Sequence, residues 1–300
     1  MDIYFISERD NFFVIYLDDI TIFSKSDAEH LVHLKQTFEK CRKHGLSLNP
    51  QKYLFALEEG KLLGHIVTKD GVKIDPKRAE VINGIPLPRN KKEVQVFLGR
   101  INFLRRFIPN YAEVVRHITD MLKKNNEVKW SQESWEAFAR IKAAFTKAPI
   151  LARPEYTKPF LVFSFASPHT VAGVLLQKNE DGLEQPIAFF SQVLHDSELK
   201  YNILEKQAYA LVKSLKAFRM YIVQSHITAF VPTAAVKDIL VQGDSEGKRG
   251  RWIAKIQEYE LEIKPTKLIK GQGLAQIVPE SNYKALGINL IIEINGSEEH

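Results

Sequence analysis

The stretch from Phe12 to Lys25, FFVIYLDDITIFSK, places two adjacent aspartates between two runs of aromatic, aliphatic and β-branched residues. Such runs are typical of β-strands, and a polar pair between them is typical of a turn. The stretch therefore predicts a β-hairpin over residues 12–23, hinged at Asp18 and Asp19. On their own, these two aspartates are compatible with a simple turn or with a pair of metal ligands.

The residues after this hairpin predict a helix and then a set of short strands. Residues 24–45 carry apolar side chains at helical spacing behind Ser26, a residue type that favours the helix N-terminus. Residues 52–75 alternate in the way that is typical of short antiparallel strands. We expect turns between these strands at Glu59–Gly60 and Asp70–Gly71.

The next segment, residues 76–150, predicts four helices. The first begins at Asp75–Pro76, with the aspartate as its cap and the proline in its first position. The second begins after Asn90, the third covers 111–124 and the fourth follows Ser131. In the fourth helix, the side chains expected to face inward are Trp135, Phe138, Ile141 and Phe145.

The second half of the chain returns to strands. Three apolar runs predict consecutive strands, with a turn at Asp181–Gly182 before the third. Helices and strands then alternate, which is typical of a mixed α/β domain. The expected strands are 160–166, 170–177, 186–190, 227–231 and 261–265, and the expected helices are 201–222, 233–240, 252–259 and 272–277.

The positive charge of the chain is concentrated in the helical segment. The whole chain has a formal net charge of +6, and residues 76–150 hold fifteen Lys and Arg against seven Asp and Glu. The other residues hold 27 basic and 29 acidic side chains. A local basic surface in a nearly neutral protein favours contact with a phosphate backbone, although a solvated basic helical surface has the same composition.

The cysteine count and the hydropathy pattern favour an intracellular protein without membrane-spanning helices. Cys41 is the single cysteine, so an internal disulfide is excluded and a reducing compartment is favoured. No run reaches the roughly 18 apolar residues that a membrane helix needs, and no signal peptide precedes the first strand. We expect an intracellular protein, cytoplasmic or nuclear, that is not secreted and has no membrane partner.

Several further motifs occur in the same order as in one known family. Together with the aspartate pair they resemble the reverse transcriptase of gypsy-type LTR retrotransposons over about residues 12–280. The motifs are VIYLDDITIFSKS (14–26), EHLVHL (29–34), NPQKYLF (49–55), LLGHIVTKDGVKIDP (62–76), FLGRINFLRRFIPNYA (97–112) and Trp130 followed by WEAF (135–138).

This resemblance implies an α/β (α+β) fold in three parts with a tail. Residues 1–75 would form a truncated reverse transcriptase palm with its hairpin and strands, and residues 76–150 a helical thumb. Residues 151–280 would form a ribonuclease H-like domain, a mixed five-stranded sheet with helices. Residues 281–300 resemble the start of a tether.

In the family, the Tyr-x-Asp-Asp motif supplies carboxylates that hold two Mg²⁺ ions for phosphoryl transfer. The resemblance therefore implies Asp18 and Asp19 as the catalytic pair and as metal ligands. The third aspartate of the family lies on a strand well upstream, and only eleven residues precede Phe12. We therefore expect half of a metal site.

The resemblance also implies residues that contact nucleic acid. The segment that lies against the primer end in the family is matched here by Leu63, Gly64 and His65. The phosphate contacts expected of the thumb are matched by Arg100, Arg105 and Arg106. By sequence alone, the arginine pair could equally lie at solvated helix ends.

The nuclease of the family uses four carboxylates, and none of them is present at the matching positions. Where related sequences carry three aspartates and one glutamate, this chain has Phe165, Gln207, Pro232 and Gln276. A neutral amide or a phenyl ring cannot balance two divalent cations, which prefer anionic oxygen ligands. We therefore expect a degenerate nuclease centre with no functional Mg²⁺. Some plant elements of this type are thought to carry such a domain as a connection.

These observations favour one function and leave an alternative open. The first is a fragment of a retrotransposon reverse transcriptase and ribonuclease H polyprotein without independent catalysis. The alternative is a domesticated nucleic-acid-binding or scaffold protein that uses the basic thumb. Residual polymerase activity would require a missing part supplied in trans. The implied partners are an RNA–DNA hybrid or other nucleic acid and the rest of the polyprotein.

Overall fold

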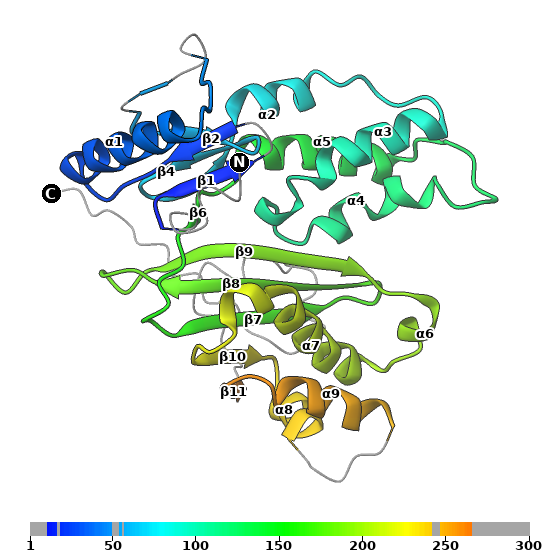
Figure 1. Cartoon of the computed structure of the whole chain (residues 1–300). Helices are drawn as coiled ribbons and strands as arrows, with labels where there is room; N and C mark the ends of the chain where they lie inside the picture. Colours follow the sequence, from blue (N-terminus) through cyan, green and yellow to red (C-terminus); the bar gives the residue numbers. More distant parts are fainter. Residues whose placement is uncertain (1–10, 17–18, 50–53, 56, 242–246, 266–300) are drawn as a thin grey trace, which may run out of the picture. The chain divides into compact units, whose positions relative to one another are not determined.

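The structure is a computed structural model that describes residues 11–16, 19–49, 54–55, 57–241 and 247–265. It divides into two compact units, an N-terminal unit of residues 1–63 and a C-terminal unit of residues 64–300, which are described separately (Figure 1). Asp18, Gln276, the predicted helix at 272–277 and the predicted tail at 281–300 lie outside the described residues.

The N-terminal unit contains the predicted hairpin and helix. Strands β1 (Phe13–Tyr16) and β2 (Asp19–Ile22) pair antiparallel, and helix α1 (Asp27–Lys43) follows. The hydroxyl of Ser26 caps this helix by accepting a hydrogen bond from the N–H of Glu29 (3.3 Å). Phe12, Phe13 and Cys41 are buried together, so a small apolar core joins the hairpin to the helix.

The strand predictions for residues 52–75 are confirmed only in their second half. Leu54, Phe55 and Leu57 lie outside strands. The turn predicted at Glu59–Gly60 is wrong, because strand β3 (Gly60–Leu62) already begins at that glycine. Strands β4 (His65–Thr68) and β5 (Gly71–Ile74) form the predicted antiparallel pair, with the connection at Lys69–Asp70.

The C-terminal unit begins with this pair and a layer of helices. The helices are α2 (Pro76–Asn83), α3 (Lys91–Asn102), the 3₁₀ turn η3 (Arg105–Phe107), α4 (Tyr111–Asp120) and α5 (Gln132–Thr146). The predicted caps Asp75, Asn90 and Ser131 each accept a hydrogen bond from a backbone N–H two or three residues further on. Strand β6 (Leu151–Ala152) then returns to β5 and ends the helical segment.

One predicted core residue of this segment is wrong. Trp135 is 50% exposed, whereas Phe138, Ile141 and Phe145 are buried as expected. Trp130 takes the inner position instead, because its ring packs edge-on against Phe138 (5.5 Å between centroids). Its indole N–H also donates to the carbonyl of Pro88 (2.7 Å), which satisfies the polar end of this half-buried side chain.

The rest of the unit is the predicted mixed five-stranded sheet with helices. The strand order is β11–β10–β7–β8–β9, in which β10 pairs parallel with both β7 and β11 and the other pairs are antiparallel. The strands are β7 (Phe160–Ala166), β8 (Thr170–Lys178), β9 (Glu184–Val193), β10 (Ile227–Val231) and β11 (Leu261–Pro265). The helices are α6 (Asp196–Leu199), α7 (Ile203–Ile222), α8 (Ala234–Val241) and α9 (Lys248–Ile256).

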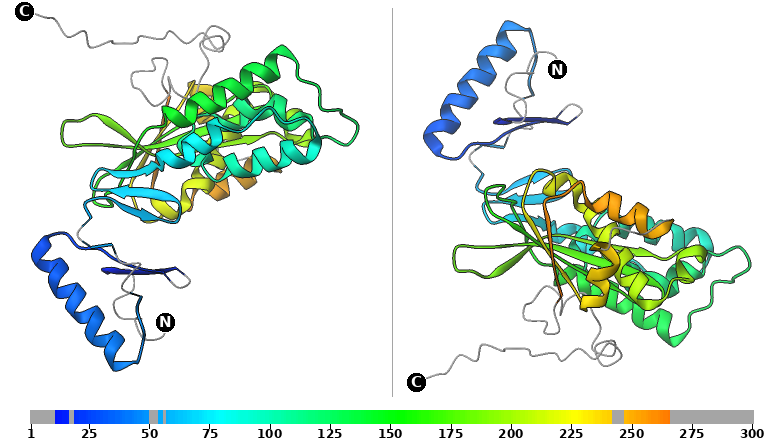
Figure 2. Two further views of the ribbon diagram at one scale, coloured as in Figure 1. Left: turned by 90° about the horizontal axis from the view of Figure 1, so that it is seen from above. Right: turned by 90° about the horizontal axis from the view of Figure 1, so that it is seen from below.

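This sheet is covered on both faces. One core combines Phe163, Phe165 and Val174 with buried side chains of the helical segment, and a second combines Val162 and Leu175 with buried side chains of α7 to α9. In Figure 2 the two layers of helices lie on opposite sides of the strands. Double burial explains why β7 and β8 read as continuous apolar runs instead of alternating.

None of the helices in the described part of the chain is long and apolar enough to cross a membrane.

We expect Gly71→Ala to destabilise the C-terminal unit by on the order of 2–3 kcal/mol. Gly71 has φ +141°, and a side-chain carbon there would overlap the carbonyl oxygen of Leu151 on β6. Urea unfolding measures the loss. The matched control is Gly99→Ala on α3, where the added carbon meets open space and should stabilise the helix by roughly 0.5–1 kcal/mol. Equal effects at the two positions would contradict this packing.

Candidate functional site

The aspartate pair is only partly described. Asp18 lies outside the described residues, and for Asp19 the structure gives the backbone, which opens β2 opposite Tyr16. The hairpin predicted around the pair is confirmed. The assignment of the two carboxylates as catalytic residues and metal ligands stays a prediction.

The predicted primer-end segment contains two left-handed residues. Leu63 has φ +51° and is 48% exposed, and Gly64 has φ +76°. The positive φ of Gly64 favours glycine, whereas the guanidinium of Arg78, which lies where a side-chain carbon would be, is the end of a flexible side chain and could move aside. The sequence pattern did not indicate this turn because a leucine with positive φ is uncommon.

His65 is held in a stack of flat groups. Its ring lies parallel to that of Phe103 (4.7 Å, 6°), and the guanidinium carbon of Arg78 lies 4.4 Å from the centroid of the same phenyl ring. Burial lowers the pKa of His65, and the charges of Arg106 and Arg78 lower it further. The imidazole is therefore neutral at neutral pH, and its Nδ1 atom is buried without a hydrogen-bond partner.

The three predicted phosphate-binding arginines differ in their surroundings. Arg100 on α3 and Arg105 on η3 are exposed, and Arg105 reaches the carbonyl of Ser191 only at 3.5 Å. Arg106 is half-buried and donates a hydrogen bond to the hydroxyl of Tyr221 on α7 (3.0 Å). Arg100 and Arg105 can reach a ligand in solution, whereas Arg106 bridges the helical segment and the sheet domain.

Phe165, at the first predicted nuclease position, is a core residue. Its side chain is 3% exposed and belongs to the core that β7 to β9 share with the helical segment. An aspartate at this place would put a carboxylate among apolar side chains, which costs several kcal/mol unless the charge is paired.

Gln207, at the second position, replaces a missing strand. It is 1% exposed, and its side-chain amide accepts from the N–H of Ala166 (2.9 Å) and donates to the carbonyl of the same residue (2.9 Å). At this end of β7, the N–H of Ser167 donates to the carbonyl of Thr170 in the β7–β8 turn (2.9 Å). The odd-numbered residues of β7 therefore direct their backbone groups to β8, and the even-numbered ones direct theirs to the β10 side. The N–H and C=O of Ala166 face this second side, where the side-chain amide of Gln207 satisfies both.

Pro232, at the third position, ends the strand that would otherwise reach this place. The last parallel pair between β7 and β10 is Phe163–Phe230. In this register the next donor would be the N–H of residue 232, bonding to the carbonyl of Ser164, and proline has no N–H. The ladder stops there, and Ala166 further along β7 is left to Gln207.

These three positions do not fit a divalent cation. A phenyl ring, a proline and an amide whose polar atoms are both hydrogen-bonded to backbone offer none of the anionic oxygens that Mg²⁺ prefers. Across the described residues, no cluster of three or more His, Cys, Asp or Glu side chains is arranged to bind a metal ion. The fourth position, Gln276, lies outside the described residues.

The carboxylate nearest in sequence to this centre is engaged elsewhere. Glu205 is buried on α7 and forms ion pairs with Lys248 (2.9 Å) and Arg249 (3.2 Å) of α9. Burial raises the pKa of Glu205, but hydrogen bonds from these two cations and from the backbone of Asn202 outweigh it, so the pKa lies below its usual value. Glu205 therefore joins two helices and cannot replace the missing nuclease carboxylate.

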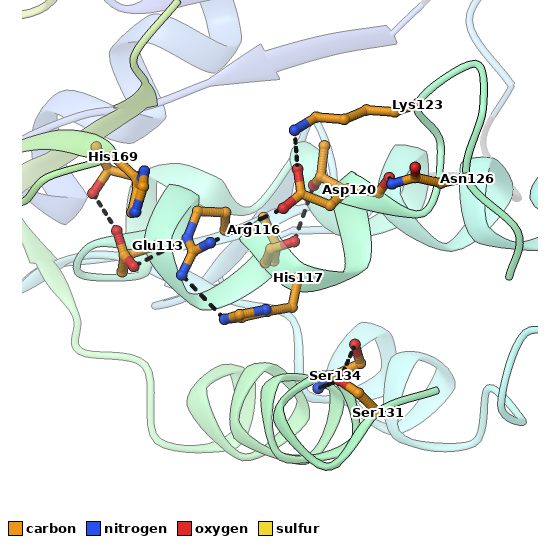
Figure 3. Close-up of polar contacts among 12 residues, drawn as sticks. Glu113, Arg116, His117, Asp120, Lys123, Asn126, Ser131, Ser134 and His169 are labelled. Atoms are coloured by element: carbon orange, nitrogen blue, oxygen red, sulfur yellow. Dashed lines mark hydrogen bonds and ion pairs between the residues drawn. The ribbon is translucent and has the colours of Figure 1, made fainter. Parts of the chain in front are cut away.

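A polar joint between helix α4 and the sheet was not predicted from the sequence. Glu113 on α4 accepts hydrogen bonds from Ser167 (2.9 Å) and Thr170 (2.6 Å) in the β7–β8 turn, and it pairs with Arg116 (3.2 Å). Figure 3 shows how the polar contacts continue along α4 through Arg116 to Asp120. Glu113 is thus the charged centre of the contact between helix α4 and the five-stranded sheet.

A second polar contact fixes the start of the same helix. The buried N–H of Ala112, in the first turn of α4, donates to the hydroxyl of Ser191 on β9 (2.9 Å). Helix N-termini leave such N–H groups without partners, so the serine satisfies one of them across the interface. The signal in the sequence was the presence of Ser167, Thr170 and Ser191 within or next to largely apolar strands.

Two family descriptions match the chain. Residues 3–67 match "Reverse transcriptase (RNA-dependent DNA polymerase)", and residues 130–229 match "RNase H-like domain found in reverse transcriptase". The first match covers the aspartate pair, and the second covers β7, β8, β9, α7 and most of β10.

Curated relatives are polyproteins of mobile elements. The chain is 35% identical over 251 residues to the retrovirus-related Pol polyprotein from transposon 297 of Drosophila melanogaster, which covers 83% of this chain and 23% of the relative. It is 30% identical over 260 residues to the transposon Tf2-3 polyprotein of Schizosaccharomyces pombe, covering 85% of this chain and 19% of the relative. The chain thus spans about a fifth of the length of these relatives.

Solved structures of the same class have a similar fold. A foamy viral protease–reverse transcriptase in complex with RNA/DNA hybrid has a TM-score of 0.74 and 25% identity, covering 93% of this chain and 38% of that one. A foamy viral protease–reverse transcriptase dRH in complex with double-stranded DNA has a TM-score of 0.75 and 25% identity, covering 90% of this chain and 48% of that one.

The palm-type hairpin, the helical segment and the ribonuclease H-like sheet define a protein of the reverse transcriptase class. The chain belongs to the reverse transcriptase and RNase H-like region of retrotransposon Pol polyproteins and corresponds to a fragment of such a polyprotein.

We expect Gln207→Glu to destabilise the C-terminal unit by about 1–3 kcal/mol at neutral pH, because a buried carboxylate would face the carbonyl of Ala166. Burial raises the pKa of such a glutamate in the folded state, so the loss should shrink as the pH falls toward the pKa of the unfolded chain. Urea unfolding at pH 4 and pH 7 measures both effects. If Gln207→Glu is as stable as the wild type at neutral pH, the side chain of Gln207 does not satisfy the backbone of Ala166 in place of a strand.

The low pKa of Glu113 predicts that its contribution to stability is lost in acid, whereas the destabilisation by Gln207→Glu is relieved in acid. Burial raises its pKa, but hydrogen bonds from Thr170 and Ser167 and the charge of Arg116 outweigh burial, so the pKa lies below the ordinary value of 4.5. Its stabilising contribution is therefore present above that value and is lost as the pH falls through the lower, folded-state pKa.

We expect Glu113→Gln to lower the free energy of unfolding by about 1–2 kcal/mol at pH 7, with the difference from wild type shrinking in acid. Unfolding curves between pH 3 and pH 7 measure this. The control is Glu80→Gln at an exposed position of α2, which should leave the whole profile unchanged. A constant difference at every pH would rule out the charged state of Glu113 as the source.

Proposed function

We propose that residues 151–265 act as a structural connection within a retrotransposon polyprotein and not as a nuclease. The observation that carries this proposal is the use of Phe165, Gln207 and Pro232 as core residue, strand substitute and strand terminator. Each has a structural task that a metal-binding carboxylate could not perform. The divalent-metal chemistry of the family therefore has no ligand at these three positions.

The contact with the helical segment supports the same function. Phe165 lies in a core shared with the helices of residues 76–150, so the place of the first carboxylate is covered by protein. Glu113 and Ser191 add polar contacts across the same interface. A connecting domain has to hold its neighbours in a fixed relative orientation. A shared close-packed core with directional hydrogen bonds gives it the rigidity to do so.

We further propose that the partner held by this arrangement is a nucleic-acid duplex. The solved relatives include complexes with double-stranded DNA and with RNA/DNA hybrid. The helical segment carries the excess positive charge of the chain, and Arg100 and Arg105 are exposed on it. Contacts of this kind neutralise phosphates without reading sequence.

Polymerisation is proposed as a property of the complete polyprotein. This chain spans 19–23% of the curated relatives, and Asp18 and Asp19 are the residues that would join further carboxylates around Mg²⁺. We also propose that the element is of the gypsy type, which the order of its sequence motifs supports, and that the remaining polyprotein is its natural partner.

The proposed function predicts binding of an RNA–DNA hybrid without cleavage. With Mg²⁺, the full chain should release no fragments from a labelled hybrid above a metal-free blank. Cleavage that is abolished by chelation and by Glu205→Gln, which removes the acid nearest in sequence to Gln207, would contradict the proposal. A ribonuclease H of known activity serves as the positive control for the assay.

Binding is measured on the same hybrid by fluorescence anisotropy over a series of salt concentrations. Arg100→Gln combined with Arg105→Gln should reduce the slope of log affinity against log salt by roughly 2, one for each lost phosphate contact. Arg106 is left unchanged because its loss would also disturb the contact with Tyr221. Lys216→Gln together with Lys237→Gln, on α7 and α8, removes the same charge as a control and should leave the slope unchanged.

A further inference from the structure

The C-terminal unit contains a pocket that neither the nuclease positions nor the polar joint of Glu113 uses. It has a volume of about 160 Å³ and lies where the β4–β5 pair, β6, β9 and the end of α7 meet. Its lining residues are Val67, Thr68, Gly71, Val72, Arg106, Leu151, Ala152, Arg153, Pro154, Ile187 and Tyr221.

The size and walls of the pocket suit one small ring. Most of the lining is apolar, with Val72, Leu151 and Ile187 among the walls. Cavities of about 150 Å³ with aliphatic walls accept a benzene ring in other proteins. The pocket therefore favours a flat apolar group of that size.

The polar part of the lining is positively charged. Arg106 and Arg153 both contribute to it, and within the described part of the chain neither has a carboxylate partner. The hydroxyl of Tyr221 accepts a hydrogen bond from Arg106 (3.0 Å), which holds the guanidinium at the pocket and leaves the phenolic proton available.

We propose that this pocket binds a small aromatic anion. The ring would occupy the apolar part, and a carboxylate or phosphate on it would be held by Arg106 and Arg153, with Tyr221 as a third donor. Guanidinium groups form paired, charge-assisted hydrogen bonds with such anions, and these bonds are stronger in a half-buried site than in open solvent.

An occupant would connect two parts of the unit. The pocket is bounded by Thr68 and Gly71 of the β4–β5 pair on one side and by Ile187 and Tyr221 of the sheet domain on the other. A bound anion would therefore tie the strands that carry His65 to the ribonuclease H-like domain. This role is independent of the proposed connection function, because it involves neither Gln207 nor Glu113.

The test uses the full chain and phenyl phosphate as the probe, with phenol and inorganic phosphate for comparison. Titration followed by the methyl resonance of Ile187 should show saturable binding of phenyl phosphate at least tenfold tighter than of either comparison compound. Arg153→Gln and Arg106→Gln should each weaken binding by about tenfold, the loss expected for a charged hydrogen bond. Arg140→Gln removes an exposed arginine on α5, away from the pocket lining, and should leave the affinity unchanged.

The proposal is overturned if Ile187 does not respond, if inorganic phosphate binds as tightly as phenyl phosphate, or if Arg153→Gln retains wild-type affinity. Arg153 is exposed, so its replacement tests binding without disturbing the fold. Hybrid binding in the proposed function is tested at Arg100 and Arg105, so either proposal can fail while the other stands.

Discussion

The sheet formed by β7, β8 and β9 is buried on both faces, and the arrangement of the C-terminal unit depends on that burial. Residues 170–177 of β8 are all buried, because the helical segment covers one face and α7 covers the other. A sheet of this kind needs apolar residues at successive positions, which the chain supplies. The same burial makes every polar group near the sheet costly unless it is hydrogen-bonded, so the few that occur have specific partners.

The roles of the residues at the predicted nuclease positions follow from this constraint. Phe165 completes the core under the helical segment, Pro232 ends β10, and Gln207 satisfies the backbone of Ala166 beyond the end of that strand. The roles of these residues are mutually consistent. Because β10 stops at Pro232, the N–H and C=O of Ala166 have no strand partner on that side, and Gln207 pairs with both. In the structure these three residues therefore serve the fold of the domain.

Most of the fold could be predicted because its signals are local. Helix caps such as Asp75 and Asn90 act within three residues, and the strands at 227–231 and 261–265 are found at their predicted bounds. The side-chain failures involve contacts made outside the residue's own helix. The partners of Glu113 lie 54 and 57 residues away, and Trp135 is displaced from the core by a tryptophan outside its helix. The sequence marked Phe165, Gln207 and Pro232 as predicted nuclease positions, which stays a prediction, and their packing and hydrogen bonds depend on strand register, which the sequence does not specify.

The helical segment and the ribonuclease H-like domain share buried side chains on one face of the sheet, so we expect them to fold as one body. Native-state hydrogen exchange measures whether they do. Buried amides of α4, such as that of Ile118, and of α7, such as that of Leu215, should open with the same free energy to within about 1 kcal/mol, because neither layer keeps its core without the other. If α4 instead exchanges through an opening several kcal/mol less costly than that of α7, the two parts are independent domains.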